Sequence, residues 1–226
     1  MMPSDKPDFT AESPLIKQGY VIGIDEAGRG PWAGPVCAAA FWIDPRALDM
    51  LPPGLTDSKK LSVKKRADIY HHLTKGPHAC EAAFSSVQMI DDIGILQANF
   101  AAMKMAADTL ARRLIEQDPL GLATSGKCEV ARVFVDGNLL PDLNYPAEAV
   151  IKGDSKILSV AAASVIAKQK RDAYMAELHE AYPVYGWDRN QGYGTKAHRQ
   201  ALSDYGITDH HRRSFAPIRK LKERQI

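Results

Sequence analysis

The sequence predicts an α/β protein in which a mixed β-sheet is flanked by helices and followed by a helical C-terminal extension. Near the N-terminus, two short apolar runs are joined by a segment rich in glycine and proline, which is typical of an antiparallel hairpin with a long loop. Further along the chain, apolar runs of strand length alternate with helical patterns, which is typical of parallel strands joined by helices. Both kinds of pairing in one chain indicate a mixed sheet.

Four strands are predicted from short apolar runs that contain β-branched and aromatic residues. The first two, at 19–24 and 36–43, flank the loop 28–35 and form the hairpin. The other two, at 130–135 and 149–151, are each followed by a glycine and an acidic residue. No internal repeat and no separate linker is visible, so one domain is expected.

Four helices are predicted, and local signals mark where some of them begin or end. The clearest is 96–114, in which apolar residues recur at steps of three and four, as one face of a helix requires. Asp118 and the proline after it end this helix. Thr195 and Gly206 are expected to cap the start and the end of the last helix. The helices are expected at 62–70, 96–114, 155–182 and 195–206.

The domain boundaries follow from composition. Residues 1–18 contain prolines and acidic residues without an apolar stretch, so a flexible tail is expected there and a signal peptide is not. Residues 19–217 are expected to form a single catalytic domain, which is mainly helical and basic over about 155–217. Residues 218–226 are expected to form a basic C-terminal tail.

The composition is that of an ordinary globular protein, with 45% hydrophobic and 25% charged residues. No apolar run approaches the roughly 20 residues that a membrane span needs, so no membrane partner is expected. The three cysteines are widely spaced, which favours a reducing cytoplasm over a disulfide scaffold or a zinc module. Residues 1–150 hold 15 Lys and Arg against 19 Asp and Glu, whereas residues 151–226 hold 14 against 8. This division suits a protein that holds cations in one place and a polyanion in another.

Four acidic residues follow predicted strands, at the ends where α/β sheets place their ligand sites. Asp25 and Glu26 end the first strand, Asp136 ends the third, and Asp154 follows the fourth. Each one alone could be a turn former or a helix cap. Because parallel neighbouring strands bring these ends side by side, we expect the four carboxylates to converge.

Converging carboxylates require a positive charge to neutralise them, because like charges a few ångströms apart repel and raise each other's pKa. Mg²⁺ or Mn²⁺ is the expected cofactor, since hard divalent cations prefer carboxylate oxygen and water. No His or Cys accompanies these acids in the sequence, which counts against zinc. A pair of such ions binds a phosphate, activates a water molecule and stabilises the leaving oxygen. The four acids therefore predict an enzyme that hydrolyses phosphodiester bonds.

Two further segments are candidates for substrate binding. In Gly28-Arg29-Gly30 the glycines let the backbone approach a ligand and the arginine can hold a phosphate. The spacing matches neither a dinucleotide fingerprint nor a P-loop. Tyr193 lies between two glycines and is expected to be freely presented for stacking, whereas the other C-terminal aromatic residues are expected to pack. The pair His210-His211 is expected to order a structural turn.

These motifs resemble the bacterial ribonuclease HII family. Residues 24–31, IDEAGRGP, look like the signature of that family, and further segments match it in order. The resemblance spans roughly Gly19 to Pro217, and its motifs are specific jointly. Gly94 stands where relatives often carry Asn, and it is expected to change a helix start and not the chemistry. The further matching segments are 57–61, 136–138, 152–155, 161–172, 192–195 and 210–215.

The resemblance implies a ribonuclease-H-like fold and a metal-dependent endoribonuclease, expected to be a monomer. Its substrates would be RNA–DNA hybrids, whose RNA strand it hydrolyses, and duplex DNA containing ribonucleotides, which it nicks on their 5′ side. Two-metal-ion hydrolysis would leave a 3′-hydroxyl and a 5′-phosphate. By resemblance, the catalytic and metal-holding residues are Asp25, Glu26, Asp136 and Asp154.

The same resemblance implies how the substrate is read. The Gly28-Arg29-Gly30 loop would bind the ribose 2′-hydroxyl at the RNA-to-DNA junction. Tyr193 would stack near the deoxynucleotide that follows the ribonucleotide. A backbone-lined loop is a sensible reader, because the 2′-hydroxyl distinguishes RNA from DNA. The implied substrate-binding residues are Gly28, Arg29, Gly30, Ser58, Lys59 and Tyr193.

Two other interpretations stay open. A noncatalytic hybrid-binding protein would use the acids structurally, bind without metal and cleave nothing. A metal-dependent exonuclease of another carboxylate family would trim ends, but such enzymes usually separate the first two acids by one residue, whereas Asp25 and Glu26 are adjacent. Incubation with a duplex that contains one ribonucleotide would separate internal nicking, end trimming and no reaction.

Overall fold

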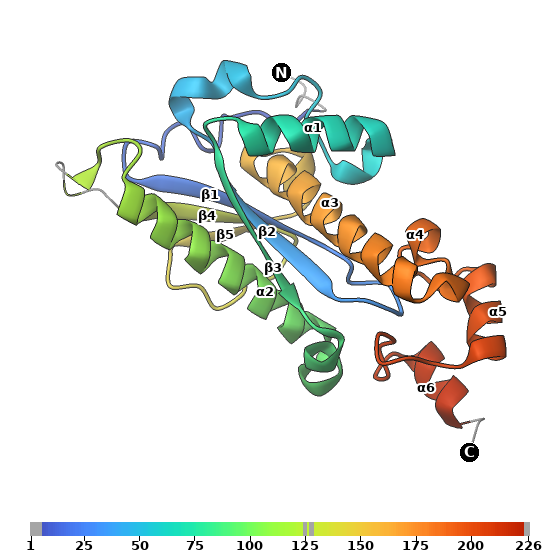
Figure 1. The fold of residues 1–226 in the computed structure, drawn as a ribbon. Coiled ribbons are helices and arrows are strands. Elements are labelled where there is room, and N and C mark those ends of the chain that lie inside the picture. Colours follow the sequence, from blue (N-terminus) through green and yellow to red (C-terminus); the bar gives the residue numbers. More distant parts are fainter. Residues whose placement is uncertain (1–5, 124–125, 127–128, 224–226) are drawn as a thin grey trace.

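The centre of the molecule, a computed structural model that describes residues 6–123, 126 and 129–223, is a five-stranded sheet (Figure 1). In spatial order its strands are β3 (Ala79–Ser85), β2 (Val36–Trp42), β1 (Tyr20–Ala27), β4 (Val130–Asp136) and β5 (Ala147–Val150). β2 pairs antiparallel with both β1 and β3, whereas β4 pairs parallel with both β1 and β5. The mixed sheet and the hairpin predicted from the sequence are confirmed.

Helices cover both faces of this sheet and extend beyond it. They are α1 (Val63–Lys75), α2 (Val87–Gln117), α3 (Leu158–Ala181), α4 (Trp187–Asn190), α5 (Lys196–Tyr205) and α6 (Ala216–Glu223). Helix α2 packs on one face of the sheet and α3 on the other, with α1 beside α3 (Figure 1). The short helices α4, α5 and α6 gather near the end of α3 (Figure 1). Among the described residues, no helix is long and apolar enough to cross a membrane.

β1 is buried on both faces because it is the central strand. Tyr20, Ile22 and Ile24 pack against α2 in one apolar cluster. The intervening residues face α3, and Gly23 lies so close to that helix that a Cβ there would be 2.3 Å from the backbone carbon of Ser159. The helix can approach the sheet this closely only because position 23 has no side chain.

β3 is a strand that the sequence pattern does not indicate. It is an edge strand, which within the described part of the chain is bonded only to β2, and several of its residues are partly exposed. Its one charged residue, Glu81, accepts a hydrogen bond from Arg113 of α2 at 3.1 Å. An edge strand does not need a continuous apolar run, so it lacks the signal that identifies the central strands.

Helix α2 begins at Val87, whereas the sequence predicts a start near residue 96. Ser86 Oγ accepts a hydrogen bond from the backbone N–H of Met89 at 3.1 Å and caps this start. Gly94 then interrupts the helix with a φ of 81°, which a residue with a Cβ rarely adopts. The apolar period therefore becomes regular only after Gly94, and this position changes where the regular helix begins.

Residues 6–18 pack against the sheet layer, so the expectation of a flexible tail over 1–18 is wrong for them. Glu12 is buried, with 1% of its surface exposed. Isolated apolar residues among prolines give no periodic signal, and these become buried only against a distant part of the chain. The apolar side chains that pack there are Ala11, Leu15 and Ile16. Residues 1–5 lie outside the described part.

Helix α6 occupies most of the predicted basic tail 218–226, and its start is anchored. Ile218 is fully buried in a cluster with Met175 of α3 and Trp187 of α4. A single apolar residue among lysines and arginines gives little indication of burial in the sequence. The end of the predicted tail, residues 224–226, lies outside the described residues.

Gly23→Ala should destabilise the protein, because the added Cβ would overlap the backbone of α3 and force β1 and α3 apart. We expect the free energy of unfolding in urea to fall by about 1–3 kcal/mol. Gly76→Ala is the control, since its backbone has an ordinary φ of −77° and its Cβ would meet the His72 carbonyl at 3.3 Å, which a small local shift relieves, in contrast to the 2.3 Å overlap at position 23. Equal losses for the two variants would show that the contact between β1 and α3 is not the tight one described here.

Candidate active site

Three acidic side chains converge where the parallel strands end. Asp25 lies in β1 and Asp136 at the end of β4, and Asp154 lies in the 3₁₀ turn Gly153–Ser155 that follows β5. One carboxylate oxygen from each of these three acids lies within 4.8 Å of the other two. The convergence expected from the strand ends is confirmed for these three residues.

The turn that carries Asp154 is tied to β4 by a hydrogen bond between its backbone and the side chain of Asp136. The N–H of Gly153 donates to Asp136 Oδ1 at 2.7 Å. The carbonyl oxygen of Gly153 accepts from the N–H groups of Lys156 and Ile157 at 2.9 and 2.8 Å, which closes the turn before α3 begins. The position of the Asp154 carboxylate therefore depends on the segment 153–157.

Burial and nearby negative charges disfavour ionisation of Asp25 and Asp154. Burial raises the pKa of Asp25 well above its usual value, and the carboxylates of Glu26 and Asp136 raise it further. Burial, followed by the charges of Asp57 and Asp136, raises the pKa of Asp154 to about 6. A bound cation would relieve this repulsion, so the group is suited to hold one.

Glu26 does not belong to the group of three, because successive residues of a strand point to opposite faces. It accepts a hydrogen bond from Arg29 at 3.3 Å and lines a small cavity with Asn99 of α2. Asp136 lines the same cavity from the end of β4, so the two sides of the site meet there. Burial raises the pKa of Glu26, whereas Arg29 lowers it. The pleat of β1 separates Glu26 from its neighbour Asp25, which the sequence pattern does not show.

Lys59 lies close enough to the acids for their negative charges to change its pKa. Burial lowers the pKa of Lys59, but the carboxylates of Asp25, Asp57 and Asp154 outweigh burial and raise it. Ser58 is buried, and its backbone N–H donates to Ser164 Oγ of α3 at 3.1 Å. Asp57 is a neighbour of the site that sequence reasoning missed, although it opens the motif that contains Ser58 and Lys59.

The Gly28-Arg29-Gly30 loop is held by a buried arginine from the C-terminal part of the chain. Arg212 has no exposed surface, and its guanidinium donates to the carbonyl oxygens of Gly28 and Arg29 at 2.6 and 2.9 Å. Its Nε also donates to the carbonyl of Gly34 at 2.9 Å. Sequence reasoning missed this anchor, whose only signal is its place in the matching segment 210–215.

A second buried arginine, Arg171 of α3, supports the same loop. It donates to the carbonyl oxygens of Pro35 and Ala33 at 3.0 and 3.2 Å. A Cβ at Gly28 would lie 1.9 Å from its Nε, and Gly28 also has a φ of 96°. Any side chain at position 28 would therefore strain the backbone and collide with Arg171, so the first glycine of the loop is required on both counts.

Tyr193 lies against the other glycine of this loop. A Cβ at Gly30 would be 3.3 Å from the Tyr193 ring, and half of the Tyr193 surface is exposed. Tyr185 and Trp187, by contrast, are 3% and 0% exposed. Tyr193 is thus freely presented, as predicted, and the structure places it beside the glycine-flanked loop.

His211 is packed inside the C-terminal part of the molecule, away from the acidic site. It is fully buried, and its Nε2 lies 3.1 Å from Nε2 of His198. Its ring packs against Tyr185 and Trp187. Burial, with His198 as the next cause, lowers the pKa of His211 to about 3, so the ring is neutral at physiological pH. This environment supports the expected structural turn.

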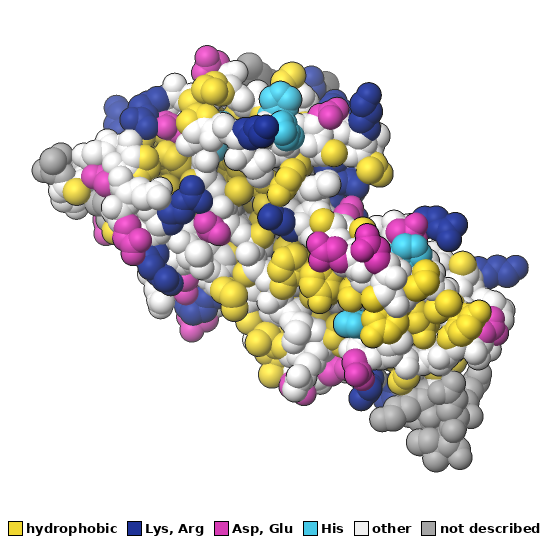
Figure 2. Space-filling view, viewed as in Figure 1, with side chains coloured by type: hydrophobic (Ala, Val, Ile, Leu, Met, Phe, Trp, Pro, Cys, Tyr) yellow, Lys and Arg dark blue, Asp and Glu magenta, His cyan; other side chains and the backbone are white. Residues whose placement is uncertain are grey.

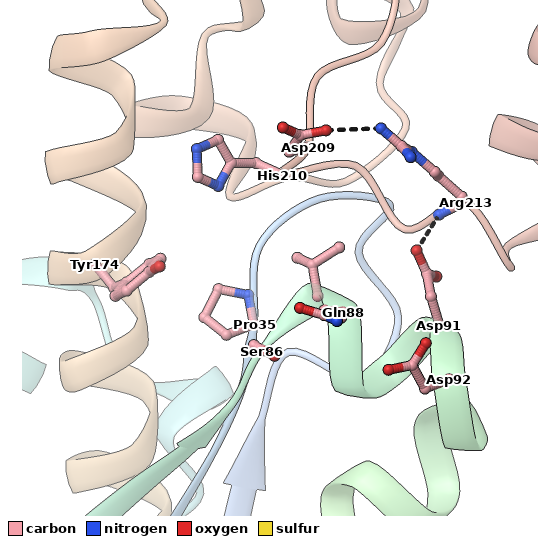
Figure 3. A pocket seen from close by; sticks show the side chains of 10 residues that line it. Pro35, Ser86, Gln88, Asp91, Asp92, Tyr174, Asp209, His210 and Arg213 are labelled. Carbon is pink, nitrogen blue, oxygen red and sulfur yellow. Dashed lines mark hydrogen bonds and ion pairs between the residues drawn. The ribbon is translucent and has the colours of Figure 1, made fainter.

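A cavity of about 650 Å³ lies between the start of α2, the middle of α3 and the segment 209–213 (Figure 3). None of the predicted site residues lines it. At its edge, Asp91 of α2 accepts hydrogen bonds from the backbone N–H groups of Arg213 and Ser214, each at 2.9 Å. This contact fixes the segment that carries Arg212, and so links α2 to the loop at residues 28–30.

The chain is similar throughout to proteins of one family. A sequence model of the family described as Ribonuclease HII matches residues 22–218. Ribonuclease HII of Magnetococcus marinus is 46% identical over 222 residues, which cover 95% of each chain. Ribonuclease HII of Neisseria meningitidis serogroup A is 47% identical over 204 residues, covering 90% of this chain and 95% of the relative.

A solved structure agrees with these sequence relationships. The ribonuclease H2 of Pyrococcus horikoshii matches the fold with a TM-score of 0.71 and 25% identity, covering 91% of this chain and 98% of that one. The sheet order, the convergent acids and the relatives point to the same conclusion. The chain belongs to the ribonuclease HII family, whose members are metal-dependent ribonucleases.

Proposed function

We propose that this protein hydrolyses the RNA strand of RNA–DNA hybrids and nicks duplex DNA on the 5′ side of embedded ribonucleotides. The cut leaves a 3′-hydroxyl and a 5′-phosphate. The observation that carries the proposal is the position of Asp25, Asp136 and Asp154, whose oxygens lie within 4.8 Å of one another. The Gly28-Arg29-Gly30 loop follows directly after β1, which brings a candidate ribose reader next to these acids.

Mg²⁺ or Mn²⁺ is the cofactor in this proposal, and the residues present fit such an ion. The three grouped donors are carboxylates, the ligands that hard divalent cations prefer, and no His or Cys of the described residues belongs to the group. Asp25, Asp136 and Asp154 would hold the metal, and Glu26 contributes a fourth carboxylate from the cavity on the other face of β1. When bound, a pair of ions activates water and stabilises the leaving oxygen.

The loop at residues 28–30 reads the ribose 2′-hydroxyl in this proposal. Arg212 occupies the carbonyl oxygens of Gly28 and Arg29, so the loop is oriented before a substrate arrives. A preorganised loop loses less conformational freedom on binding than a mobile one. Tyr193, packed on Gly30, then stacks beside the deoxynucleotide that follows the ribonucleotide.

Lysines beside the acids and at the start of α1 supply phosphate contacts. Lys59 lies near the carboxylates, and Lys64 and Lys65 are exposed at the start of α1. On the face drawn in Figure 2, Lys and Arg side chains lie over the part of the surface around α1. Arg66 is not available for this role, because it is buried and forms an ion pair with Asp172 at 3.2 Å.

A cytoplasmic location and a monomeric state belong to the same proposal. Cys37 and Cys80 are free thiols, as expected in a reducing compartment, while Cys128 lies outside the described residues. Burial raises the pKa of Cys37 to about 12, so this thiol stays protonated and unreactive.

An internally labelled DNA duplex that contains one ribonucleotide tests the activity directly. With Mg²⁺ we expect a single nick on the 5′ side of the ribonucleotide. The same duplex with a deoxynucleotide at that position should stay intact, because a site built to bond a hydroxyl rejects a ligand that lacks it. Trimming from the ends, or binding without any cleavage, would contradict the proposal.

Asp136→Asn should lower the cleavage rate by several orders of magnitude, because it removes one negative charge from the group that holds the metal. Asn keeps an oxygen for the N–H of Gly153, so the fold and its melting temperature should change little. Substrate binding without metal should stay equal or tighten, since a charge that repels phosphate is gone. The exposed Asp142→Asn is the matched control and should cleave as the wild type does. Near-wild-type turnover by Asp136→Asn would remove Asp136 from the mechanism.

Tyr193→Ala should weaken cleavage at a lone ribonucleotide in DNA more than cleavage inside a long RNA strand. Only the junction substrate presents the deoxyribose on which the ring stacks, and such stacking is typically worth about 1–3 kcal/mol. Steady-state cleavage of the two substrates gives the comparison. Tyr205→Ala, which removes an exposed ring of α5, is the control. Equal losses on both substrates would mean that Tyr193 is a general binding residue.

A further inference from the structure

The N-terminal segment, residues 8–16, lies against the chain that follows Asp154. The backbone N–H of Asp8 donates to the carbonyl of Lys156 at 3.2 Å, and the N–H of Leu158 donates to the carbonyl of Asp8 at 3.2 Å. Asp8 thereby forms a parallel bridge with Ile157. These contacts cover the junction between the turn that carries Asp154 and the first residue of α3.

Glu12 caps helix α3 from this segment. The helix begins at Leu158, and the residue before it, Ile157, offers no side-chain cap. Instead Glu12 Oε1 accepts the backbone N–H of Ser159 at 3.0 Å. The first N–H groups of a helix have no partner within it, so an oxygen that accepts one of them stabilises the start of the helix. A residue remote in sequence thus supplies the cap that the local sequence lacks.

Apolar packing reinforces this cap. Ala11, Leu15 and Ile16 pack against a cluster that includes Phe134 of β4 and Val160 of α3. The segment therefore joins the strand that ends in Asp136 to the helix that follows Asp154. The hydrogen bond from Gly153 to Asp136 makes the same connection from inside the site.

The turn needs such support because of the charges it carries. Asp154 lies beside Asp136 and Asp25, and when these carboxylates are ionised without a bound cation their like charges repel, which favours movement of the turn away from the other two acids. Two and four residues after Asp154, at Lys156 and Leu158, the chain is hydrogen-bonded to Asp8, and Ser159 is bonded to Glu12. A fixed helix start limits how far the turn can swing away from the other two acids.

We propose that Glu12 is a positioning residue: by capping α3, it and the segment 8–16 hold Asp154 in the arrangement that binds the divalent cation. This inference rests on the proposed function, because it takes Asp154 as part of the metal-holding group. Glu12 itself touches neither the acids nor the substrate in this proposal. It acts through the turn 153–157.

Three variants of the full-length protein test this role. Glu12→Ala removes the cap, whereas Glu12→Gln keeps an oxygen that can accept the Ser159 N–H. Ser86→Ala is the matched control, because it removes the N-cap of α2, which carries none of the grouped acids. Binding of Mn²⁺ is measured by electron paramagnetic resonance, without substrate, together with the melting temperature and the amide hydrogen exchange of residues 153–157.

We expect Glu12→Ala to weaken Mn²⁺ binding about tenfold, because loss of a group bonded directly to a metal ligand typically costs about 10–100-fold and Glu12 acts one step further away, through the turn 153–157. Exchange at the amides of Lys156 and Ile157 should become faster. Glu12→Gln should restore most of the affinity. Ser86→Ala should lower the melting temperature but leave both Mn²⁺ affinity and exchange at residues 153–157 unchanged.

Other outcomes overturn the inference. If Glu12→Ala and Ser86→Ala change Mn²⁺ affinity equally, the segment 8–16 only adds stability. If the glutamine variant binds no better than the alanine variant, the cap is not the cause. A wild-type protein that binds no Mn²⁺ would remove the metal-holding group and this inference with it. A wild-type protein that binds Mn²⁺ and cleaves neither hybrid nor ribonucleotide-containing duplex would refute the proposed function alone, since the comparison of Mn²⁺ affinities stands without cleavage.

Discussion

Three carboxylates, those of Asp25, Asp136 and Asp154, are held within 4.8 Å of one another in a largely buried position, where their repulsion is strong. The surrounding structure supplies what holds them. Parallel pairing fixes the ends of β1 and β4 side by side, and a hydrogen bond from the backbone N–H of Gly153 joins the Asp136 carboxylate to the turn of Asp154. Gly23 lets α3 approach β1 closely, which keeps the start of that helix, and the turn before it, against the sheet.

Two buried arginines, Arg171 and Arg212, hold the Gly28-Arg29-Gly30 loop in place. The loop is thus built around buried positive charges, whereas the acidic site is built from buried negative charges. Arg171 and Arg212 are both almost inaccessible, and burial, with Arg171 as the next cause, lowers the pKa of Arg212 to about 9. Such burial is tolerable because the guanidinium donates to several backbone carbonyl oxygens. Asp91 of α2 fixes the segment after Arg212. The Gly28-Arg29-Gly30 loop is therefore oriented by helices from both faces of the sheet, α2 and α3, and by the C-terminal part of the chain.

The sequence by itself determined the fold class, four of the five strands and the convergence of three acids. These features depend on residues that are close in the chain: an apolar run followed by an acid, or a helix with a recognisable start and end. Thr195 and Gly206 cap α5 as predicted, because a hydroxyl before a helix and a glycine after it act on neighbouring backbone groups. Membership of the family could also be inferred, since its motifs are short and local.

Only the tertiary structure decided the features that join distant residues. Arg212 and Gly28 are 184 residues apart, and Glu12 and Ser159 are 147 apart, so no local pattern could predict either hydrogen bond. The edge strand β3 and the packed segment 6–18 lack a clear local signal, because Glu81 interrupts the apolar residues of β3 and the apolar residues of the segment gain burial only from remote partners. Adjacency in sequence does not reveal that the pleat of β1 places Glu26 on the face opposite to Asp25, where it lines a cavity together with Asp136.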